Sequence, residues 1–94
     1  MSEDHAKLSE PEIRAALSAD WTIGADMIQT TFVFKDFNEA WAFMTKVAQA
    51  AEQADHHPEW CNIYNRVTIK LSTHEAGGVT TKDVQLARAI DQLK

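Results

Sequence analysis

The sequence contains a single cysteine, Cys61, so no disulfide can form within the chain and nothing in its cysteine content points to secretion. The N-terminal segment 1–5 is polar and acidic, without the basic start and apolar run of a signal peptide. A composition of 45% hydrophobic and 24% charged residues is that of an ordinary globular protein, neither disordered nor membrane-spanning. We therefore expect a soluble, cytoplasmic protein that does not contact a membrane.

Basic residues are also few. Nine lysines and arginines stand against 14 aspartates and glutamates, which gives a net charge of −5. A general nucleic-acid-binding surface needs a basic stripe, so direct binding to nucleic acid is not expected. With 94 residues, the chain is expected to form one domain, residues 1–94, with a modest hydrophobic core.

Glycine-rich motifs are absent as well. The three glycines, Gly24, Gly77 and Gly78, match no dinucleotide- or phosphate-binding fingerprint. No serine stands on a glycine-rich elbow, and Cys61 falls within an expected strand, so nucleophilic catalysis is poorly supported. The chemistry of this chain must therefore come from other side chains.

The pattern of apolar and polar residues predicts an alternation of helices and antiparallel strands. Ser9 and Glu12 have the spacing of a capping box that opens a first helix, with Pro11 in its first turn. Asp36 has the pattern of an N-cap for a longer helix, and a final helix is expected to begin at Thr80. The expected strands comprise residues 21–23, 27–34, 60–64 and 67–73.

The long helix after Asp36 has two apolar stripes, and one sheet cannot cover both. The stripe expected to be buried comprises Phe37, Ala40, Trp41, Met44, Val47, Ala48 and Ala51. The second stripe comprises Phe43, Val47, Ala50 and Ala54. It is either a set of exposed alanines with one large residue or a helix-to-helix contact between subunits, because small residues permit close packing. The sequence leaves both interpretations open.

The strands 60–64 and 67–73 are expected to form a hairpin around Asn65 and Arg66, because asparagine tolerates the left-handed conformation of a tight turn. Counting outward from this loop sets His57 opposite His74. Facing residues of an antiparallel pair have Cβ atoms about 4.5–5.5 Å apart. This register therefore predicts that two histidines distant in sequence meet at the open end of the hairpin.

Three of the four histidines, His56, His57 and His74, lie in two short segments that also contain carboxylates. Histidine exchanges protons near neutrality, so this clustering suggests proton-transfer chemistry or a metal site. If the long helix persists to residue 56, Glu52 and His56 form an i,i+4 pair on one helix face. A carboxylate beside an imidazole orients the ring and favours its protonated form.

Asp83 follows the expected helix start at Thr80 by three positions. Its simplest role is to support the N-terminus of the final helix. The alternative is a polar contact with the histidine site, because only a short loop separates Asp83 from His74.

A zinc site is less well supported by the sequence. Adjacent residues of an extended segment point to opposite sides, so His56 and His57 would not easily share one ion. No HExxH, no CxxC and no second cysteine adds a ligand. We therefore predict no metal ligand, and histidines with a purely structural role are the other alternative.

Three segments combine these residues in a specific order: EQADHHPEW at 52–60, NIYN at 62–65 and LSTHE at 71–75. With them the chain strongly resembles the pterin-4a-carbinolamine dehydratase family, also called 4a-hydroxytetrahydrobiopterin dehydratases. The resemblance extends from Trp21 to Ile90. The chain departs from the family at Cys61, where many members carry an aromatic residue, and at the turn 24–26, which lacks a basic residue common there. Neither departure touches the histidines.

The resemblance implies an enzyme that removes water from a 4a-hydroxytetrahydropterin, the product left by aromatic amino acid hydroxylases, and forms quinonoid dihydropterin in tetrahydrobiopterin recycling. By similarity, His56 and His74 are the acid/base pair, while His57 anchors the substrate and shares in proton transfer. Two imidazoles on either side of a flat ring can supply both proton transfers, so no metal or cofactor is implied.

The resemblance also assigns the residues around the histidines. Asp55 is expected to orient the site. The pterin pocket is expected to be lined by Ser72, Thr73 and Glu75, with Glu52 and Asp83 as further candidates.

The fold implied by the family is α+β, a four-stranded antiparallel sheet with three helices packed on one face. The family assembles as homodimers or homotetramers, and its vertebrate members also act as dimerisation cofactors of a homeodomain transcription factor. A dimerisation or regulatory protein with the same fold is therefore the alternative function. A pterin- or molybdopterin-related role in an organism without an aromatic hydroxylase is a third alternative.

Overall fold

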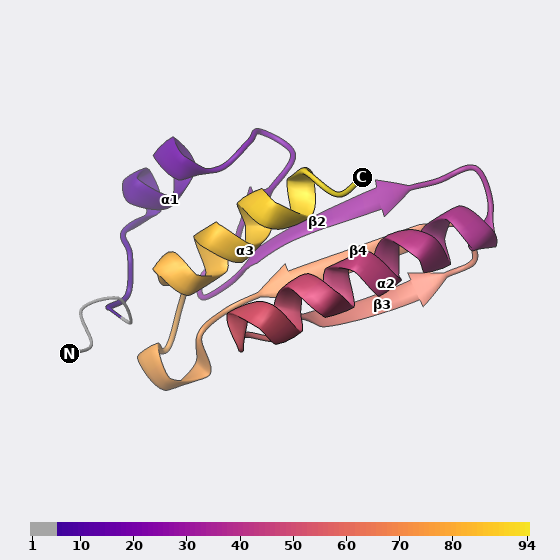
Figure 1. Cartoon of the computed structure of the whole chain (residues 1–94). Coiled ribbons are helices and arrows are strands. Elements are labelled where there is room, and N and C mark those ends of the chain that lie inside the picture. The colour runs from indigo at the N-terminus through magenta and orange to yellow at the C-terminus, as the bar shows by residue number, and fades with distance from the viewer. Residues whose placement is uncertain (1–5) are drawn as a thin grey trace.

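The structure is a computed structural model that describes residues 6–94. Segment 1–5, from which we predicted the absence of a signal peptide, lies outside the described residues. Four antiparallel strands form one sheet in the order β1-β2-β4-β3 (Figure 1). In chain order the elements are α1 (Glu10–Ala16), β1 (Thr22–Ile23), β2 (Ile28–Val33), α2 (Phe37–Ala54), β3 (Glu59–Ile63), β4 (Arg66–Leu71), the 3-10 helix η2 (His74–Ala76) and α3 (Thr81–Asp91).

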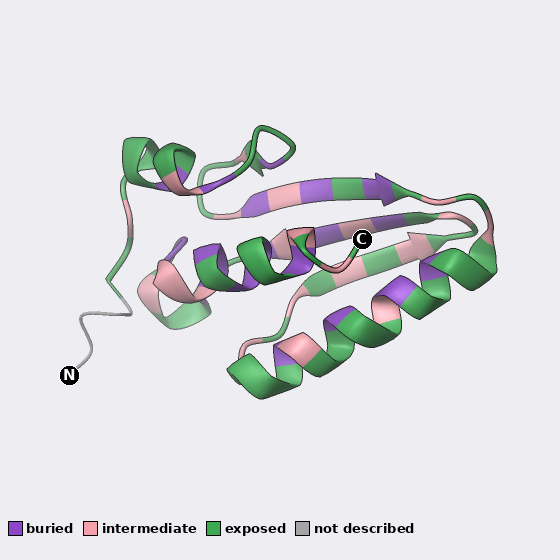
Figure 2. Cartoon of the chain, turned by 45° about the horizontal axis from the view of Figure 1, so that its top comes forward, coloured by how far each residue is buried: buried purple, intermediate pink, exposed green. Residues whose placement is uncertain are grey.

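The helices cover one face of the sheet, and α2 packs beside α3 (Figure 1). Along β2 and β4 the buried residues alternate with more exposed ones, so the opposite face of the sheet stays open (Figure 2). Residues from all three helices enter one hydrophobic core. This arrangement confirms the predicted α+β class with three helices on one face. The largest fully buried apolar side chains are Trp21, Ile28, Ile69, Leu71 and Ile90.

Local sequence signals place the helix starts where we expected them. Ser9 and Glu12 form a reciprocal capping box at α1, and Asp36 accepts a hydrogen bond from the backbone of Glu39 at α2. The final helix is capped by Thr80, which forms a second capping box with Asp83. These signals are read correctly from the sequence because each involves residues only three positions apart.

The register predicted for the β3–β4 hairpin is wrong. Each residue of β3 pairs with a residue of β4 that lies two positions earlier in the chain than predicted. Ile63 pairs with Arg66 and Glu59 with Lys70, so the loop is Tyr64-Asn65. Asn65 is held by its amide, which donates to the carbonyl of Phe34 at 2.8 Å, and this contact with the end of β2 fixes the position of the loop. Tyr64, not asparagine, takes the left-handed conformation, with φ of 51°.

The correction removes the argument that set His57 opposite His74. Continuing the observed count from Glu59↔Lys70 brings Ser72, not His74, opposite His57, and the ladder ends at Glu59. If the two histidines act on one substrate, the connection between them has to come from tertiary contacts.

The buried stripe of α2 also differs from the predicted one. Ala40, Phe43, Val47 and Ala51 are buried, with spacings of three and four residues. Phe43 belongs to the stripe that we expected to be exposed or intersubunit, and its ring lies 4.9 Å from those of both Phe32 and Phe34. Contact with these two rings, one on β2 and one directly after it, turns the Phe43 side of the helix towards the sheet. The predicted core residues Phe37 and Trp41 are consequently exposed, as is Ala48, while Met44 is only partly buried.

Candidate active site

The end of α2 turns the chain sharply at Asp55. This residue takes the left-handed conformation, with φ of 51°, and its backbone N–H donates to the carbonyls of Ala51 and Glu52. His56 then donates its own backbone N–H to Ala51 at 3.1 Å. The helix therefore ends before His56, so the condition for an i,i+4 pair of Glu52 with His56 is not met.

Glu52 pairs with the neighbouring histidine instead. Its Oε1 atom lies 2.9 Å from Nε2 of His57. Both side chains are largely exposed, at 81% for Glu52 and 60% for His57. An exposed pair of this kind contributes little to stability, but it limits the orientations of the His57 ring.

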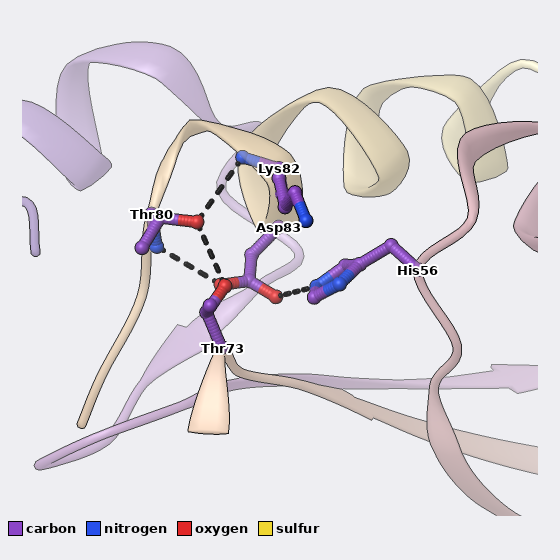
Figure 3. A network of polar contacts seen from close by, with 5 residues as sticks. All are labelled: His56, Thr73, Thr80, Lys82 and Asp83. Atoms are coloured by element: carbon purple, nitrogen blue, oxygen red, sulfur yellow. Dashed lines mark hydrogen bonds and ion pairs between the residues drawn. The ribbon is translucent and has the colours of Figure 1, made fainter. Parts of the chain in front are cut away.

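His56 points the other way, into the protein. Its Nε2 atom lies 2.5 Å from Oδ1 of Asp83 at the start of α3 (Figure 3). The His56 side chain is 12% exposed, and that of Asp83 is completely buried. The pair joins the end of α2 to the first turn of α3.

The second oxygen of Asp83 is also fully engaged. Oδ2 accepts the backbone N–H of Thr80 at 2.9 Å and the hydroxyl of Thr73 at 2.8 Å. The hydroxyls of Thr73 and Thr80 lie 2.7 Å apart (Figure 3). Both alternatives for Asp83 therefore hold, because it supports the helix N-terminus and contacts a histidine. We call His56, Thr73, Thr80 and Asp83 the Asp83 network.

Thr73 connects this network to the third histidine. It is the N-cap residue of η2, which begins at His74, and its backbone N–H donates to the carbonyl of Gly78 at 2.8 Å. Gly77 closes the turn with φ of 73°, a conformation that suits glycine. The turn leaves the His74 side chain exposed, directly after a residue bound to Asp83.

The structure thus divides the predicted site residues into two groups. His56, Thr73 and Asp83 meet in one hydrogen-bonded network, and Glu52 pairs with His57 beside it. The other four predicted site residues are exposed and stand directly beside His56 or close to Thr73 in the sequence: Asp55, Ser72, His74 and Glu75. Thr80 was identified in the sequence only as a helix start, and a capping residue gives no local signal that it also joins a buried network.

A groove of about 350 Å³ between α2 and α3 is lined in part by His56. Apart from His56, none of its lining residues was a predicted site residue, because a groove between two helices depends on how the helices pack. The other lining residues are Ala50, Gln53, Ala54, Lys82, Gln85, Leu86 and Ala89.

Two further features are absent from the part of the chain that the structure describes. Within residues 6–94, no group of three or more His, Cys, Asp or Glu side chains is arranged to hold a metal ion. None of the helices there combines the length and the hydropathy required to cross a bilayer.

The fold and the site define a small α+β protein with histidines supported by carboxylates at the carboxyl end of a long helix. The family model described as pterin 4 alpha carbinolamine dehydratase matches residues 6–93. The chain therefore belongs to the pterin-4a-carbinolamine dehydratase family, as the sequence motifs predicted.

Individual relatives agree with this assignment. A protein of Bradyrhizobium diazoefficiens, provisionally named pterin-4-alpha-carbinolamine dehydratase, is 59% identical over 76 residues, which cover 79% of this chain and 76% of the relative. A relative from Mesorhizobium japonicum with the same provisional name is 51% identical, covering 90% of this chain and 91% of its own. The crystal structure of a transcriptional coactivator/pterin dehydratase from Brucella melitensis matches with a TM-score of 0.86 and 41% identity, covering 93% of this chain and 97% of that one.

Proposed function

We propose that the protein eliminates water from a 4a-hydroxytetrahydropterin and forms the quinonoid dihydropterin, in the recycling of tetrahydrobiopterin in the cytoplasm. In this reaction the C4a–O bond breaks and the hydroxyl leaves as water with a proton from a general acid. The N5–H proton passes to a general base as the C4a=N5 double bond forms. One proton is donated and one is accepted, so the reaction needs no metal, cofactor or external oxidant.

The observation that carries the proposal is the pairing of two adjacent histidines with two carboxylates. His56 contacts buried Asp83, and His57 contacts exposed Glu52. A carboxylate that holds one imidazole nitrogen leaves the other nitrogen for a substrate, which is the arrangement that general acid/base catalysis needs. Membership of the family supplies the substrate class.

The roles follow from the family assignment and from these contacts. His56 and His74 exchange the protons, and His57 anchors the pterin while sharing in proton transfer. The backbone around Ser72, Thr73 and Glu75 contributes polar groups to the pocket, and Asp55 orients the segment. The groove beside His56 has a volume in the range of small-molecule sites, which supports the approach of a bicyclic ring to this histidine.

The direct test is stopped-flow dehydration of freshly made 4a-hydroxytetrahydropterin by purified protein that has been treated with a chelator. We expect a rate far above the spontaneous rate in the same buffer, without any added metal. A rate equal to the spontaneous one would contradict the proposed function. Loss of rate on chelation with recovery on addition of zinc would contradict the metal-free mechanism.

We also propose that the chain assembles as a homodimer or homotetramer. Five large apolar side chains are exposed at the end of the molecule formed by the β3–β4 turn and the start of α2: Val33, Phe37, Trp41, Ile63 and Tyr64. The rings of Phe37 and Trp41 stack with centroids 6.2 Å apart. Beside Trp41, an apolar groove of about 210 Å³ extends to Trp60 on β3. Soluble monomers rarely expose such a concentration of apolar groups.

Sedimentation equilibrium tests this assembly. Trp41→Glu should shift the protein towards monomer, because a charge cannot be buried in an apolar contact without a partner. Gln49→Glu adds the same charge on an exposed part of the same helix and should leave the mass unchanged. A monomeric wild-type protein would contradict the proposal. Self-association without any dehydration activity would instead favour the alternative function as a dimerisation or regulatory protein.

A further inference from the structure

The hydrogen bonds of the Asp83 network have only one consistent direction. Thr73 donates its single hydroxyl hydrogen to Oδ2 of Asp83. The 2.7 Å contact between Thr73 and Thr80 therefore needs the Thr80 hydroxyl as its donor. The Thr80 oxygen in turn accepts the backbone N–H of Lys82 at 3.2 Å. Every hydrogen in this chain of contacts points towards the Asp83 carboxylate.

Asp83 can accept hydrogen bonds at both oxygens but has none to give when ionised. Oδ2 already receives two donors, from Thr80 and Thr73. Oδ1 faces Nε2 of His56, so this ring nitrogen is the one that carries a hydrogen. Within residues 6–94, no protein hydrogen bond reaches Nδ1 of His56, and no buried side-chain nitrogen or oxygen lacks a partner. Nδ1 is therefore open to solvent or to a ligand.

We propose that Asp83 is a positioning residue that fixes His56 in the Nε2–H tautomer, so that Nδ1 is the atom that accepts the N5 proton of the pterin. This inference rests on the proposed function and deepens it. It also gives Asp83 and the Thr73 hydroxyl a role different from substrate binding. Asp83 is fully buried, and both of its oxygens are engaged by protein donors.

The proton balance of this step is simple. Nδ1 takes the proton from N5, and the electron pair of the N–H bond forms the new C4a=N5 bond as the hydroxyl leaves. His56 then carries a proton on each nitrogen, and the adjacent Asp83 carboxylate stabilises this positive charge. Release of the Nδ1 proton to water restores the starting tautomer.

Asp83→Asn tests the tautomer because the network allows only one orientation of the amide. The position of Oδ2 faces the backbone N–H of Thr80, which can only donate, so the amide oxygen must take that place. The amide NH₂ then faces Nε2 of His56 and donates to it. The substitution keeps the helix cap but inverts the tautomer, and the hydrogen moves to Nδ1.

The tautomer can be measured directly by NMR on protein labelled with ¹⁵N-histidine, at mildly alkaline pH where free imidazole is neutral. Wild-type His56 should show a pyrrole-type Nε2 and a pyridine-type Nδ1, and Asp83→Asn should exchange the two. In the dehydration assay the same variant should lose about 10²–10⁴-fold in kcat, with KM nearly unchanged, because the base is presented wrongly only for the chemical step. In serine proteases, replacing the aspartate of the triad by asparagine has an effect of this kind.

Two controls separate positioning from a purely structural role. Glu12→Gln makes the equivalent change in the capping box of α1, which has no histidine, and should change neither the His56 spectrum nor kcat. Thr73→Val removes one donor to Asp83 and should lower kcat less than Asp83→Asn does, with the Nε2–H tautomer retained. Thr73→Ser restores the hydroxyl and should recover most of the loss.

The outcomes distinguish this inference from the proposed function. A pyridine-type Nε2 in the wild-type protein would overturn the inference whatever the activity. An inverted tautomer in Asp83→Asn with unchanged kcat would show that Nδ1 is not the reacting atom, while dehydration itself would stand. An inactive wild-type protein would overturn the proposed function, and the NMR spectrum would still decide how Asp83 orients His56.

Discussion

Helices α1 and α3 begin with the same motif, but the two copies lie in very different surroundings. At α1, Ser9 and Glu12 satisfy each other at the protein surface, with Oε1 of Glu12 accepting the backbone N–H of Ser9 at 2.8 Å. At α3, Asp83 accepts the backbone N–H of Thr80 at a similar distance of 2.9 Å, but is completely buried. The local hydrogen bond is alike, and what differs is the burial of the carboxylate and the further partners that its two oxygens bind.

That difference shows how a structural motif acquires a functional role. The buried box at α3 receives a threonine hydroxyl and a histidine in addition to its own backbone. A buried carboxylate has to be satisfied at both oxygens, so each added partner is held firmly in place. The exposed box at α1 can complete its bonding with water, and it therefore holds nothing but its helix.

The largest difference between the two regions should appear in catalysis. His56→Ala combined with His74→Ala removes both proposed proton-transfer groups, each of which typically contributes about 10²–10⁴-fold. We expect dehydration to fall close to the spontaneous rate, with losses that are not additive, since one imidazole can partly replace another. Each single variant should lose turnover more than binding, whereas His57→Ala should mainly raise KM. Stopped-flow kinetics measures all four proteins.

The matching change at α1, Ser9→Ala combined with Glu12→Ala, should leave the rate of dehydration unchanged. His56→Ala also leaves buried Asp83 without one donor, so circular dichroism must show that the variant is folded at the assay temperature. Wild-type rates in a folded double histidine variant would refute the assignment of the catalytic residues and favour an interaction protein.

The next largest effect concerns stability. Asp83→Ala leaves the Thr80 N–H, the Thr73 hydroxyl and His56 without their shared acceptor. A buried donor left without its acceptor typically costs about 1–3 kcal/mol, and this substitution removes the acceptor of several donors at once. Denaturant unfolding should therefore show a large loss for Asp83→Ala and a much smaller one for Glu12→Ala. Equal losses would mean that the burial of the α3 box adds nothing to its energetics.

Both capping boxes could be predicted from the sequence because their hydrogen bonds join residues three positions apart. The family motif also predicted His56, Thr73 and Asp83 as site residues, and in the structure the side chain of Asp83 contacts those of the other two. The sequence could not show that Asp83 is buried or that Oδ1 faces His56. Both facts depend on the packing of α3 against the end of α2, which no local pattern encodes.

The errors have the same origin. The predicted hairpin register was wrong because Asn65 is fixed by the carbonyl of Phe34, which directly follows β2, and not by its own turn preference. The predicted set of buried residues on α2 was wrong because Phe43 packs against Phe32 on β2, which leaves Trp41 exposed. In both cases a contact between residues distant in sequence overrode a preference that was read correctly from neighbouring residues.

A smaller effect is expected for the exposed pair of Glu52 with His57. Glu52→Gln should change the free energy of unfolding by less than about 1 kcal/mol, because exposed ion pairs contribute little. If Glu52 orients the ring that anchors the pterin, the same variant should raise KM modestly and leave kcat nearly unchanged. A loss of stability as large as that of Asp83→Ala would contradict the contrast between exposed and buried carboxylates.

The smallest effect should be the pH dependence of the α1 capping box. The hydrogen bonds from the Ser9 backbone and then from its hydroxyl lower the pKa of Glu12 in the folded state. A carboxyl whose folded pKa is lowered contributes its stability fully above the unfolded pKa and loses it as the pH falls through the folded one. The Tm of wild-type protein should therefore exceed that of Glu12→Gln by a small margin near neutral pH, and the margin should shrink in acid, below the ordinary glutamate pKa of about 4.3. Differential scanning calorimetry of both proteins over this pH range measures the effect.

Because Glu12 is exposed, added salt should reduce the margin at neutral pH as well. A margin that grows as the pH falls would mean that Glu12 is held less favourably in the folded protein than in the unfolded chain, which its hydrogen bonds with Ser9 contradict.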